Sequence, residues 1–486
     1  MINHYRPPVG LLYLGGFLTH KGLKVKIIDI PMKEQIRDKK FFENLNHIIE
    51  GVHQKMLEEF KRIKTKIVGL SCYTPEYFEV LRLAQEIKAI DPSIKIIAGG
   101  VHPTFYPQDF FDERTGIDAC VLGDGEAAMY ELSSNILEGK AEWGNVAGIA
   151  VFDPATQKMA LTQERALAEN LDDISFPDYG LIDMDYYTNA NPYAIRGCFL
   201  RPAYLLSTRG CPSQCTFCVA KKLRKYVGIG RKRSAESLIA ELKGLKSSYA
   251  IDAFYFIDDL FTIDKENVKR FCVMLKDEHL GLLWGCSSKV STLDEDLLKS
   301  MANAGCIQID FGVERGSDEA LRSVKKGINV SKVRDIFKLC HRYRIRTFAN
   351  MLINLPGETE NDLCDILGLL DAIRPEIVSL NIFTPYPGTE IYDQSSYRFS
   401  KKEYPLLSKS VPWLLKEYPE KFRYAAHNVD LEKWTSTYTK KYNKILPNLK
   451  FYLDRRFWKA WFGSQAKGNY LMQFHLLIKE FINQKF

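Results

Sequence analysis

The sequence alternates short apolar segments with longer segments of helical periodicity, and it does so in two separate series. Strands that alternate with helices predict βαβ units, and consecutive units of this kind build parallel sheets. A chain of 486 residues is also too long for one ordinary hydrophobic core, so two or three domains are expected. The pattern therefore predicts an α/β protein with two successive parallel-sheet domains.

The first series predicts a doubly wound sheet of Rossmann type within residues 1–150. Ligands of such sheets bind beyond the carboxyl ends of the strands, where glycine lets a backbone approach a ligand closely. Any one glycine-containing turn here is most simply an ordinary βα turn, but several along one edge favour a cofactor site. The strands are expected at residues 24–30, 65–74, 94–100 and 118–126.

The second series predicts a partial or full barrel of the TIM kind over residues 201–395. Residues 151–200 precede it and contain turn formers and aromatic residues, which is typical of a surface connector. In such barrels the chemistry lies at the carboxyl ends of the strands. The six strands are expected at residues 203–210, 253–259, 282–288, 306–314, 346–358 and 377–389.

The third region, residues 396–486, is dense in Tyr, Trp, Lys and Phe and is predicted to be helical. A packed C-terminal subdomain is the simplest interpretation, and a substrate lid or a basic, aromatic helix at a membrane surface is the alternative. The sequence contains no run of about eighteen apolar residues, so no membrane span is predicted. The formal net charge of +7 is mild for this length and does not by itself indicate nucleic acid.

Three of the eleven cysteines, Cys211, Cys215 and Cys218, lie within eight residues. Thiolates at this spacing bind a soft metal. A structural zinc site would need four closed ligands, no histidine lies near, and three thiols cannot pair evenly in disulfides. A cubane iron–sulfur cluster held by three thiolates keeps one iron open for a ligand. The spacing therefore favours a catalytic 4Fe–4S site.

The other cysteines are scattered singly. An odd count, the lack of a signal peptide and the tight cluster indicate a reducing, cytoplasmic location. Cys198 is interpreted as a core or loop residue rather than as a fourth ligand. Six more are expected to be small buried side chains: Cys72, Cys120, Cys272, Cys306, Cys340 and Cys364.

The segment CPSQCTFC resembles the signature loop of radical S-adenosylmethionine (SAM) enzymes. In that family the open iron chelates SAM, and one electron cleaves SAM to methionine and a 5′-deoxyadenosyl radical. The segments FYFIDDLFTID, IDFGVERGSDEAL, LINLPGETENDL and FTPYPGTEIY resemble later strands of the same family, in its order. For each acidic residue a helix N-cap or a solvated loop is the alternative. The resemblance implies metal and catalytic roles for the three cysteines and cofactor contacts from Phe217, Asp258, Glu314, Ser317, Gly357 and Glu358.

The N-terminal part resembles the subfamily with a cobalamin-binding Rossmann domain before the barrel, on the segments GLSCYTP, IIAGGVHPT and VLGDGEAAMYEL. The resemblance covers about residues 7–392. The Asp-x-His-x-x-Gly motif that supplies a histidine to cobalt in some cobalamin proteins is absent, which implies cobalamin bound without that histidine. His102 is interpreted as a loop residue. Cobalamin contacts are implied for Ser71, Thr74, Gly99, Gly100, Gly123, Gly125 and Glu126.

The resemblance implies a cobalamin-dependent radical SAM enzyme that methylates, or closes a ring at, an unactivated carbon of a lipid, tetrapyrrole or natural product. It also implies a one-electron reductant such as a flavodoxin or ferredoxin. The aromatic C-terminal region is compatible with peripheral membrane contact, and no basic RNA-binding module is evident. Two alternatives stay open: a radical SAM enzyme without cobalamin, and an iron–sulfur electron-transfer or regulatory protein, which the count of three cysteines opposes.

Overall fold

The computed structural model describes most of the chain and divides it into two compact units. The first comprises Met1–Tyr186, Leu223–Gly228 and Tyr397–Ser408, and the second comprises the remainder. The described residues are 6–30, 45–111, 115–140, 143–153, 156, 158–191, 193–196, 198, 200–395, 398–409, 420–426, 429–442 and 454–463.

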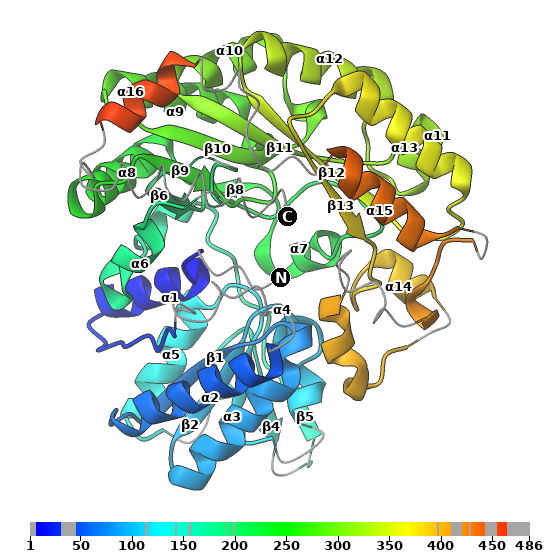
Figure 1. Cartoon of the computed structure of the whole chain (residues 1–486). Helices are drawn as coiled ribbons and strands as arrows, with labels where there is room; N and C mark the ends of the chain where they lie inside the picture. Colours follow the sequence, from blue (N-terminus) through cyan, green and yellow to red (C-terminus); the bar gives the residue numbers. More distant parts are fainter. Residues whose placement is uncertain are drawn as a thin grey trace. The chain divides into compact units, whose positions relative to one another are not determined.

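The first unit contains a five-stranded sheet in the order β1-β2-β3-β4-β5, drawn in blue and cyan in Figure 1. β1 (Ile67–Ser71), β2 (Lys95–Gly99) and β3 (Ala119–Val121) are parallel, and β4 (Ile149–Asp153) and β5 (Lys158–Leu161) add antiparallel strands. Its helices are α1 (Val9–His20), α2 (Leu45–Lys61), α3 (Tyr77–Ile90), α4 (Val101–Phe105) and α5 (Glu126–Leu137), with short 3-10 turns η1 (Thr74–Glu76), η2 (Pro107–Phe110), η3 (Leu171–Asp173) and η4 (Tyr179–Leu181).

Two features of this sheet differ from the sequence prediction. Residues 24–30, predicted as a strand, form none. Their apolar side chains are satisfied by packing instead, since Leu23 and Val25 pack against the core cluster around Leu18 and Ile97. The β4–β5 hairpin was not predicted, because its sequence lacks a strong two-residue alternation.

The second unit contains a six-stranded parallel sheet in the order β13-β12-β11-β10-β9-β6. All six predicted barrel strands are confirmed, and because each strand pairs with the next in sequence, the sheet is a partial barrel. A short β7–β8 pair (Thr208–Arg209 with Arg231–Lys232) lies beside it. The strands are β6 (Pro202–Leu205), β9 (Ala253–Phe256), β10 (Leu283–Ser288), β11 (Cys306–Glu314), β12 (Arg346–Ile353) and β13 (Ile377–Ile382).

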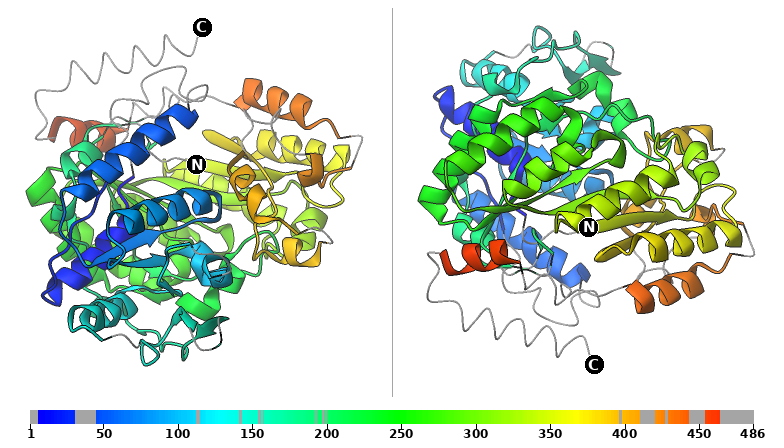
Figure 2. Two further views of the ribbon diagram at one scale, coloured as in Figure 1. Left: turned by 90° about the horizontal axis from the view of Figure 1, so that it is seen from below. Right: turned by 90° about the horizontal axis from the view of Figure 1, so that it is seen from above.

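Helices follow the strands and cover the outer face of the curved sheet, as Figures 1 and 2 show. They are α8 (Ala235–Tyr249), α9 (Lys265–Asp277), α10 (Glu295–Asn303), α11 (Asp318–Ser323), α12 (Val330–Arg342) and α13 (Glu360–Ile373). The remaining elements are α6 (Met184–Thr188), α7 (Ala220–Val227), η5 (Phe261–Ile263), η6 (Val290–Thr292), α14 (Glu390–Gln394), η7 (Lys401–Lys409), η9 (Glu420–Phe422), α15 (Leu431–Tyr442) and α16 (Arg455–Gly463).

Helix α12 illustrates how the sequence specifies these elements. Its buried residues Val333, Ile336, Phe337 and Cys340 recur every three or four positions, so one face packs on the sheet. The side chain of Asn329 caps the helix by accepting a hydrogen bond from the backbone of Lys332. Both signals involve residues close together in the sequence, so the sequence alone can predict them.

The cysteines outside the loop behave as predicted, with one exception. Cys72, Cys120, Cys272, Cys306 and Cys340 are buried. Cys364 is exposed on α13, so its predicted burial is wrong: the buried stripe of that helix runs through Leu363, Ile366 and Leu370 instead. Among the described residues, no helix is long and apolar enough to cross a membrane.

Candidate active site

The three-cysteine loop begins beyond the carboxyl end of β6, and a buried carboxylate holds its first residues. Asp258, just after β9, accepts hydrogen bonds at Oδ1 from the backbone N–H groups of Ser207 (2.7 Å) and Thr208 (2.6 Å). Its Oδ2 accepts from the Ser207 hydroxyl at 2.7 Å. Burial raises the pKa of the Asp258 carboxyl to about 6, although these hydrogen bonds oppose the rise. Asp258 therefore fixes the path of the chain into the loop.

The middle of the loop is held by segments that follow three other strands. After β10, Lys289 Nζ donates to the Ser213 hydroxyl at 3.1 Å. After β11, the carbonyl of Val324 accepts from the Thr216 N–H at 3.2 Å. After β13, the Ile391 N–H donates to the Thr216 carbonyl at 3.1 Å. The loop is thus tied to segments that follow four strands of the sheet, β9, β10, β11 and β13.

The thiols of this loop lie close enough to influence one another. Burial raises the pKa of the Cys218 thiol to about 11, and the charges of Cys215 and Cys211 add to that rise. Burial also raises the pKa of Cys215, while Lys326 and Lys289 lower it. The second effect favours thiolates, the form that binds iron.

The three thiols of the loop are compatible with a 4Fe–4S cluster. Among the described residues, no three His, Cys, Asp or Glu side chains are grouped closely enough to hold one metal ion. A cubane cluster does not require such a group, because each thiolate binds a different iron and the sulfurs stand apart. Cys198 takes no part: it is buried, and its sulfur accepts a hydrogen bond from Arg346 at 3.5 Å.

Glu314 reaches the loop through a buried lysine. It lies at the carboxyl end of β11 with a left-handed φ of 70°, and its Oε1 is 2.9 Å from Lys326 Nζ. The same Nζ lies 5.6 Å from the centroid of the Phe217 ring, between two of the cysteines. Burial alone would lower the pKa of Lys326, but Glu314 and the nearby thiols raise it on balance. The amine is therefore a buried cation beside the loop.

Two of the other predicted cofactor residues of this unit, Ser317 and Glu358, have structural partners. Ser317 caps α11, because its hydroxyl accepts a hydrogen bond from the Ala320 N–H at 3.4 Å. Glu358 is buried, pairs with Arg315 and accepts from the Asn354 N–H. Gly357 has a φ of 75°, which only glycine adopts readily, and no atom lies within 4 Å of the position a Cβ would take.

In the first unit, the structure brings Ser71, Gly99 and Gly100 together at the carboxyl edge of its sheet. A Cβ on Gly100 would lie 3.4 Å from Ser71 Oγ and 3.0 Å from the Cys72 carbonyl oxygen, and Gly100 has a φ of 103°. A Cβ on Gly99 would meet no atom within 4 Å. Ser71 and Gly100 are exposed. This open stretch of small residues fits the close passage of a large ligand such as cobalamin.

Thr104 joins this edge to the next predicted loop. Its hydroxyl donates to the Gly100 carbonyl at 2.7 Å and accepts from the Gly123 N–H at 3.0 Å. A Cβ on Gly123 would lie only 2.5 Å from the Tyr226 carbonyl oxygen, so the chain itself fills that space. Gly125 precedes α5, and Glu126 is buried at its first position.

His102 is not the loop residue that was expected. It lies in α4 and is completely buried, with Nδ1 3.1 Å from Thr74 Oγ1 and Nε2 3.3 Å from Asp109 Oδ2. The Tyr404 hydroxyl donates to the same Asp109 oxygen at 2.8 Å. Both nitrogens of His102 thus face protein groups. Thr74 faces His102 rather than the open edge.

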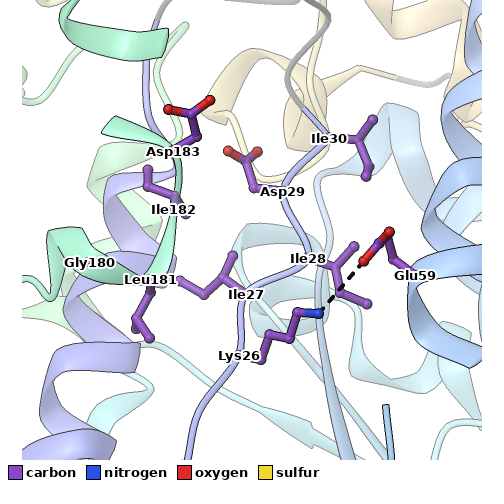
Figure 3. A pocket seen from close by; sticks show the side chains of 10 residues that line it. All are labelled: Lys26, Ile27, Ile28, Asp29, Ile30, Glu59, Gly180, Leu181, Ile182 and Asp183. Carbon is purple, nitrogen blue, oxygen red and sulfur yellow. Dashed lines mark ion pairs between the residues drawn. The ribbon is translucent and has the colours of Figure 1, made fainter. Parts of the chain in front are cut away.

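A separate pocket of the first unit holds none of the predicted site residues. It is an open space of about 330 Å³, drawn in Figure 3, and Lys26 and Glu59 form an ion pair of 3.6 Å at its wall. In the figure the carboxylates of Asp29 and Asp183 lie together toward one end. Isoleucines line much of the rest, and nothing in this lining matches the predicted cofactors.

Sequence reasoning missed Lys289 and Lys326. Lys289 directly follows β10 and Lys326 lies three residues after α11, which was the available signal, but lysine at such positions is usually a solvated side chain. Only the fold shows that both approach the thiols.

Two family models match the chain. The B12 binding domain matches residues 2–133, and the radical SAM superfamily matches residues 205–370. Together they confirm the predicted pairing of a cobalamin domain with a SAM-dependent iron–sulfur domain, and they confirm the predicted cofactors, a 4Fe–4S cluster, SAM and cobalamin, as those of the family.

Known proteins with similar chains are named as methyltransferases and as a cyclase. An uncharacterized methyltransferase of Pyrococcus horikoshii is 29% identical over 80% of this chain and 78% of its own. An anaerobic magnesium-protoporphyrin IX monomethyl ester cyclase of Rubrivivax gelatinosus is 28% identical over 80% of this chain and 66% of its own. The solved structure of the radical SAM methyltransferase TsrM from Kitasatospora setae has a TM-score of 0.63 at 17% identity, over 79% of this chain and 72% of its own, which shows the shared fold.

The cysteine loop on a partial barrel, the glycine-lined edge of the preceding sheet and the two family matches agree. The chain is a radical SAM enzyme with an N-terminal cobalamin-binding domain.

Proposed function

We propose that this protein is a methyltransferase that transfers the methyl group of SAM to an unactivated carbon of a small molecule. The observation that carries the proposal is the three-cysteine loop tied to the carboxyl edge of a parallel sheet, in one chain with a B12 binding domain. When bound, the cluster would supply one electron to SAM, and cobalamin would carry the methyl group.

The residues of the chain divide this work. Cys211, Cys215 and Cys218 would hold three irons and leave the fourth for SAM. Phe217, Glu314, Ser317, Gly357 and Glu358 are proposed as the surroundings of SAM, while Asp258 positions the loop. In the first unit, Ser71, Gly99 and Gly100 offer the open passage for cobalamin, with Thr74, Gly123, Gly125 and Glu126 supporting that edge.

Ring formation is the second candidate, favoured by the similarity to the protoporphyrin ester cyclase. In either case the substrate is proposed to be a lipid, a tetrapyrrole or another natural product, and the electron to come from a flavodoxin or ferredoxin. A cytoplasmic location belongs to this proposal because the thiols of a cluster site need reducing surroundings.

The proposal can be tested without knowing the substrate. The protein would be reconstituted anaerobically with iron and sulfide and incubated with SAM and a strong one-electron reductant, with and without cobalamin. We expect S-adenosylhomocysteine, which remains when SAM gives up its methyl group, only with cobalamin. We expect 5′-deoxyadenosine whenever the cluster is present.

The matched variants are the Cys211→Ala, Cys215→Ala, Cys218→Ala triple and the single Cys364→Ala. The triple variant should lose both products and its iron, and Cys364→Ala should behave as wild type. Formation of 5′-deoxyadenosine without any cobalamin-dependent S-adenosylhomocysteine would contradict methyl transfer. Persistence of either product in the triple variant would contradict the site itself.

A further inference from the structure

We propose that Lys289 and Lys326 tune the iron–sulfur cluster by placing two positive charges against it, and that Glu314 offsets part of that charge. The inference rests on the proposed cluster site at the three cysteines and does not depend on the methyl-transfer step. It assigns roles to two lysines that no sequence pattern singled out.

Lys326 is held in place on three sides. Its side chain is about one tenth exposed, its Nζ is 2.9 Å from Glu314 Oε1, and it lies over the Phe217 ring at 5.6 Å. A Cβ on Gly312 would lie 2.7 Å from this Nζ, so glycine is what allows the amine to cross the strand there. Because Phe217 directly precedes Cys218, this position puts a fixed cation beside the loop.

Lys289 approaches the same loop from β10. Its Nζ donates to the Ser213 hydroxyl, midway between Cys211 and Cys215, at 3.1 Å. A Cβ on Gly327, the residue after Lys326, would lie 3.2 Å from Lys289 Nζ, so the two lysine-bearing segments adjoin. Within the described part of the chain, no carboxylate forms an ion pair with Lys289.

These charges bear on the electron transfer that the cluster must perform. Three thiolates and the cluster carry net negative charge, and reduction adds one electron without moving any atom. That electron comes from an external low-potential one-electron donor. Positive charge in a partly desolvated site stabilises the reduced form, since Coulomb energies grow as water is excluded, and nearby charge is known to set cluster potentials. The two lysines therefore make the cluster easier to reduce, and the Glu314 carboxylate acts in the opposite direction.

The opposite signs give a sharp test. The reconstituted protein, without SAM, would be titrated potentiometrically and followed by the electron paramagnetic resonance of the reduced cluster. Lys289→Met removes a charge at similar size and should shift the midpoint potential to a more negative value. Glu314→Gln leaves Lys326 uncompensated and should shift it to a more positive value.

Two control variants separate charge from other effects. Lys325→Met changes the neighbouring lysine, which pairs with Glu390 and is about half exposed, and should leave the potential unchanged. Ser213→Ala removes the hydrogen bond of Lys289 without removing its charge and should shift the potential less than Lys289→Met.

Each outcome is decisive. Shifts of the same sign for Lys289→Met and Glu314→Gln, or no shift beyond that of Lys325→Met, would overturn the inference while leaving the cluster site intact. If Lys289→Met binds no iron, Glu314→Gln still tests the sign. Failure of the wild-type protein to hold a cluster would instead overturn the proposed function.

Discussion

Replacement of Asp258 offers the most direct check on how the cysteine loop is held. In Asp258→Asn, the amide oxygen can keep both backbone N–H groups of Ser207 and Thr208, which already share one carboxylate oxygen. The amide nitrogen takes the place of the other oxygen and can donate to the Ser207 hydroxyl. Asp258→Ala removes all of these partners. We therefore expect the two variants to behave differently although both remove the charge.

The magnitudes follow from burial. The pKa of Asp258 rises from its ordinary value of 3.8 to about 6, mainly through burial. A rise of roughly two units corresponds to about 3 kcal/mol. Because the folded state binds the proton more tightly, this stability is present below about pH 4 and is lost as the pH rises through about 6.

At pH 7 the Asn variant should therefore be at least as stable as wild type. In the Ala variant, three donors without partners cost about 2 kcal/mol each, and relief from burying the carboxylate offsets about 3 kcal/mol of this. The expected net loss in the free energy of unfolding is about 3 kcal/mol.

The assay is guanidinium unfolding of the cluster-free protein between pH 4 and 7.5, followed by tryptophan fluorescence. Trp284 is fully buried in the same sheet and reports on it. The difference in stability between wild type and Asp258→Asn should widen from about pH 4 to about pH 6. An Asn variant that loses as much stability as the Ala variant, or that keeps the wild-type pH dependence, would refute the reasoning.

Three further substitutions and one chemical modification test other features. Gly100→Ala forces a Cβ against the Cys72 backbone at a φ of 103° and should lower the free energy of unfolding by about 1–3 kcal/mol, measured by thermal unfolding. In Gly99→Ala the new Cβ meets no atom, so this variant should keep its stability but retain less cobalamin on desalting. Equal losses of stability in the two variants would contradict the geometry. Arg315→Ala leaves the Glu358 carboxylate buried without its cation and should lower the free energy of unfolding by about 3–5 kcal/mol. A melting temperature close to that of wild type would contradict this expectation. Iodoacetamide should alkylate Cys364 first among the cysteines outside the loop, because its side chain is exposed. Peptide mass spectrometry would follow the reaction, and slower alkylation of Cys364 than of the buried thiols would contradict its exposure.

The barrel strands and the cysteine loop were predictable because their signals are local. Each of the six strands is a short apolar run followed by a helical pattern, and the hydrophobic period alone identifies such units. The spacing of Cys211, Cys215 and Cys218 is equally local, since one loop carries all three.

The features that were missed depend on contacts distant in sequence. The positions of Lys289 and Lys326 beside the cysteine loop depend on the folded arrangement of β10, β11 and the loop, which lie apart in the sequence. His102 looked like a loop residue because its burial depends on Asp109 and Tyr404, the latter some 300 positions away. Residues 24–30 have the composition of a strand, but composition does not supply a pairing partner.

The first unit is discontinuous in the chain, and this affects how the protein is made. The unit requires the segment around Tyr404, which binds Asp109 and lies against His102, yet that segment is synthesised roughly 210 residues after Tyr186. At about 5–20 residues per second, a ribosome needs about 10–40 s to produce it. Throughout that interval the aromatic surface around Tyr77 and His102 lacks its cover. The nascent chain therefore passes through a stage in which its first unit exposes an aromatic surface that chaperones can bind, and this surface is covered only after residue 404 has been synthesised.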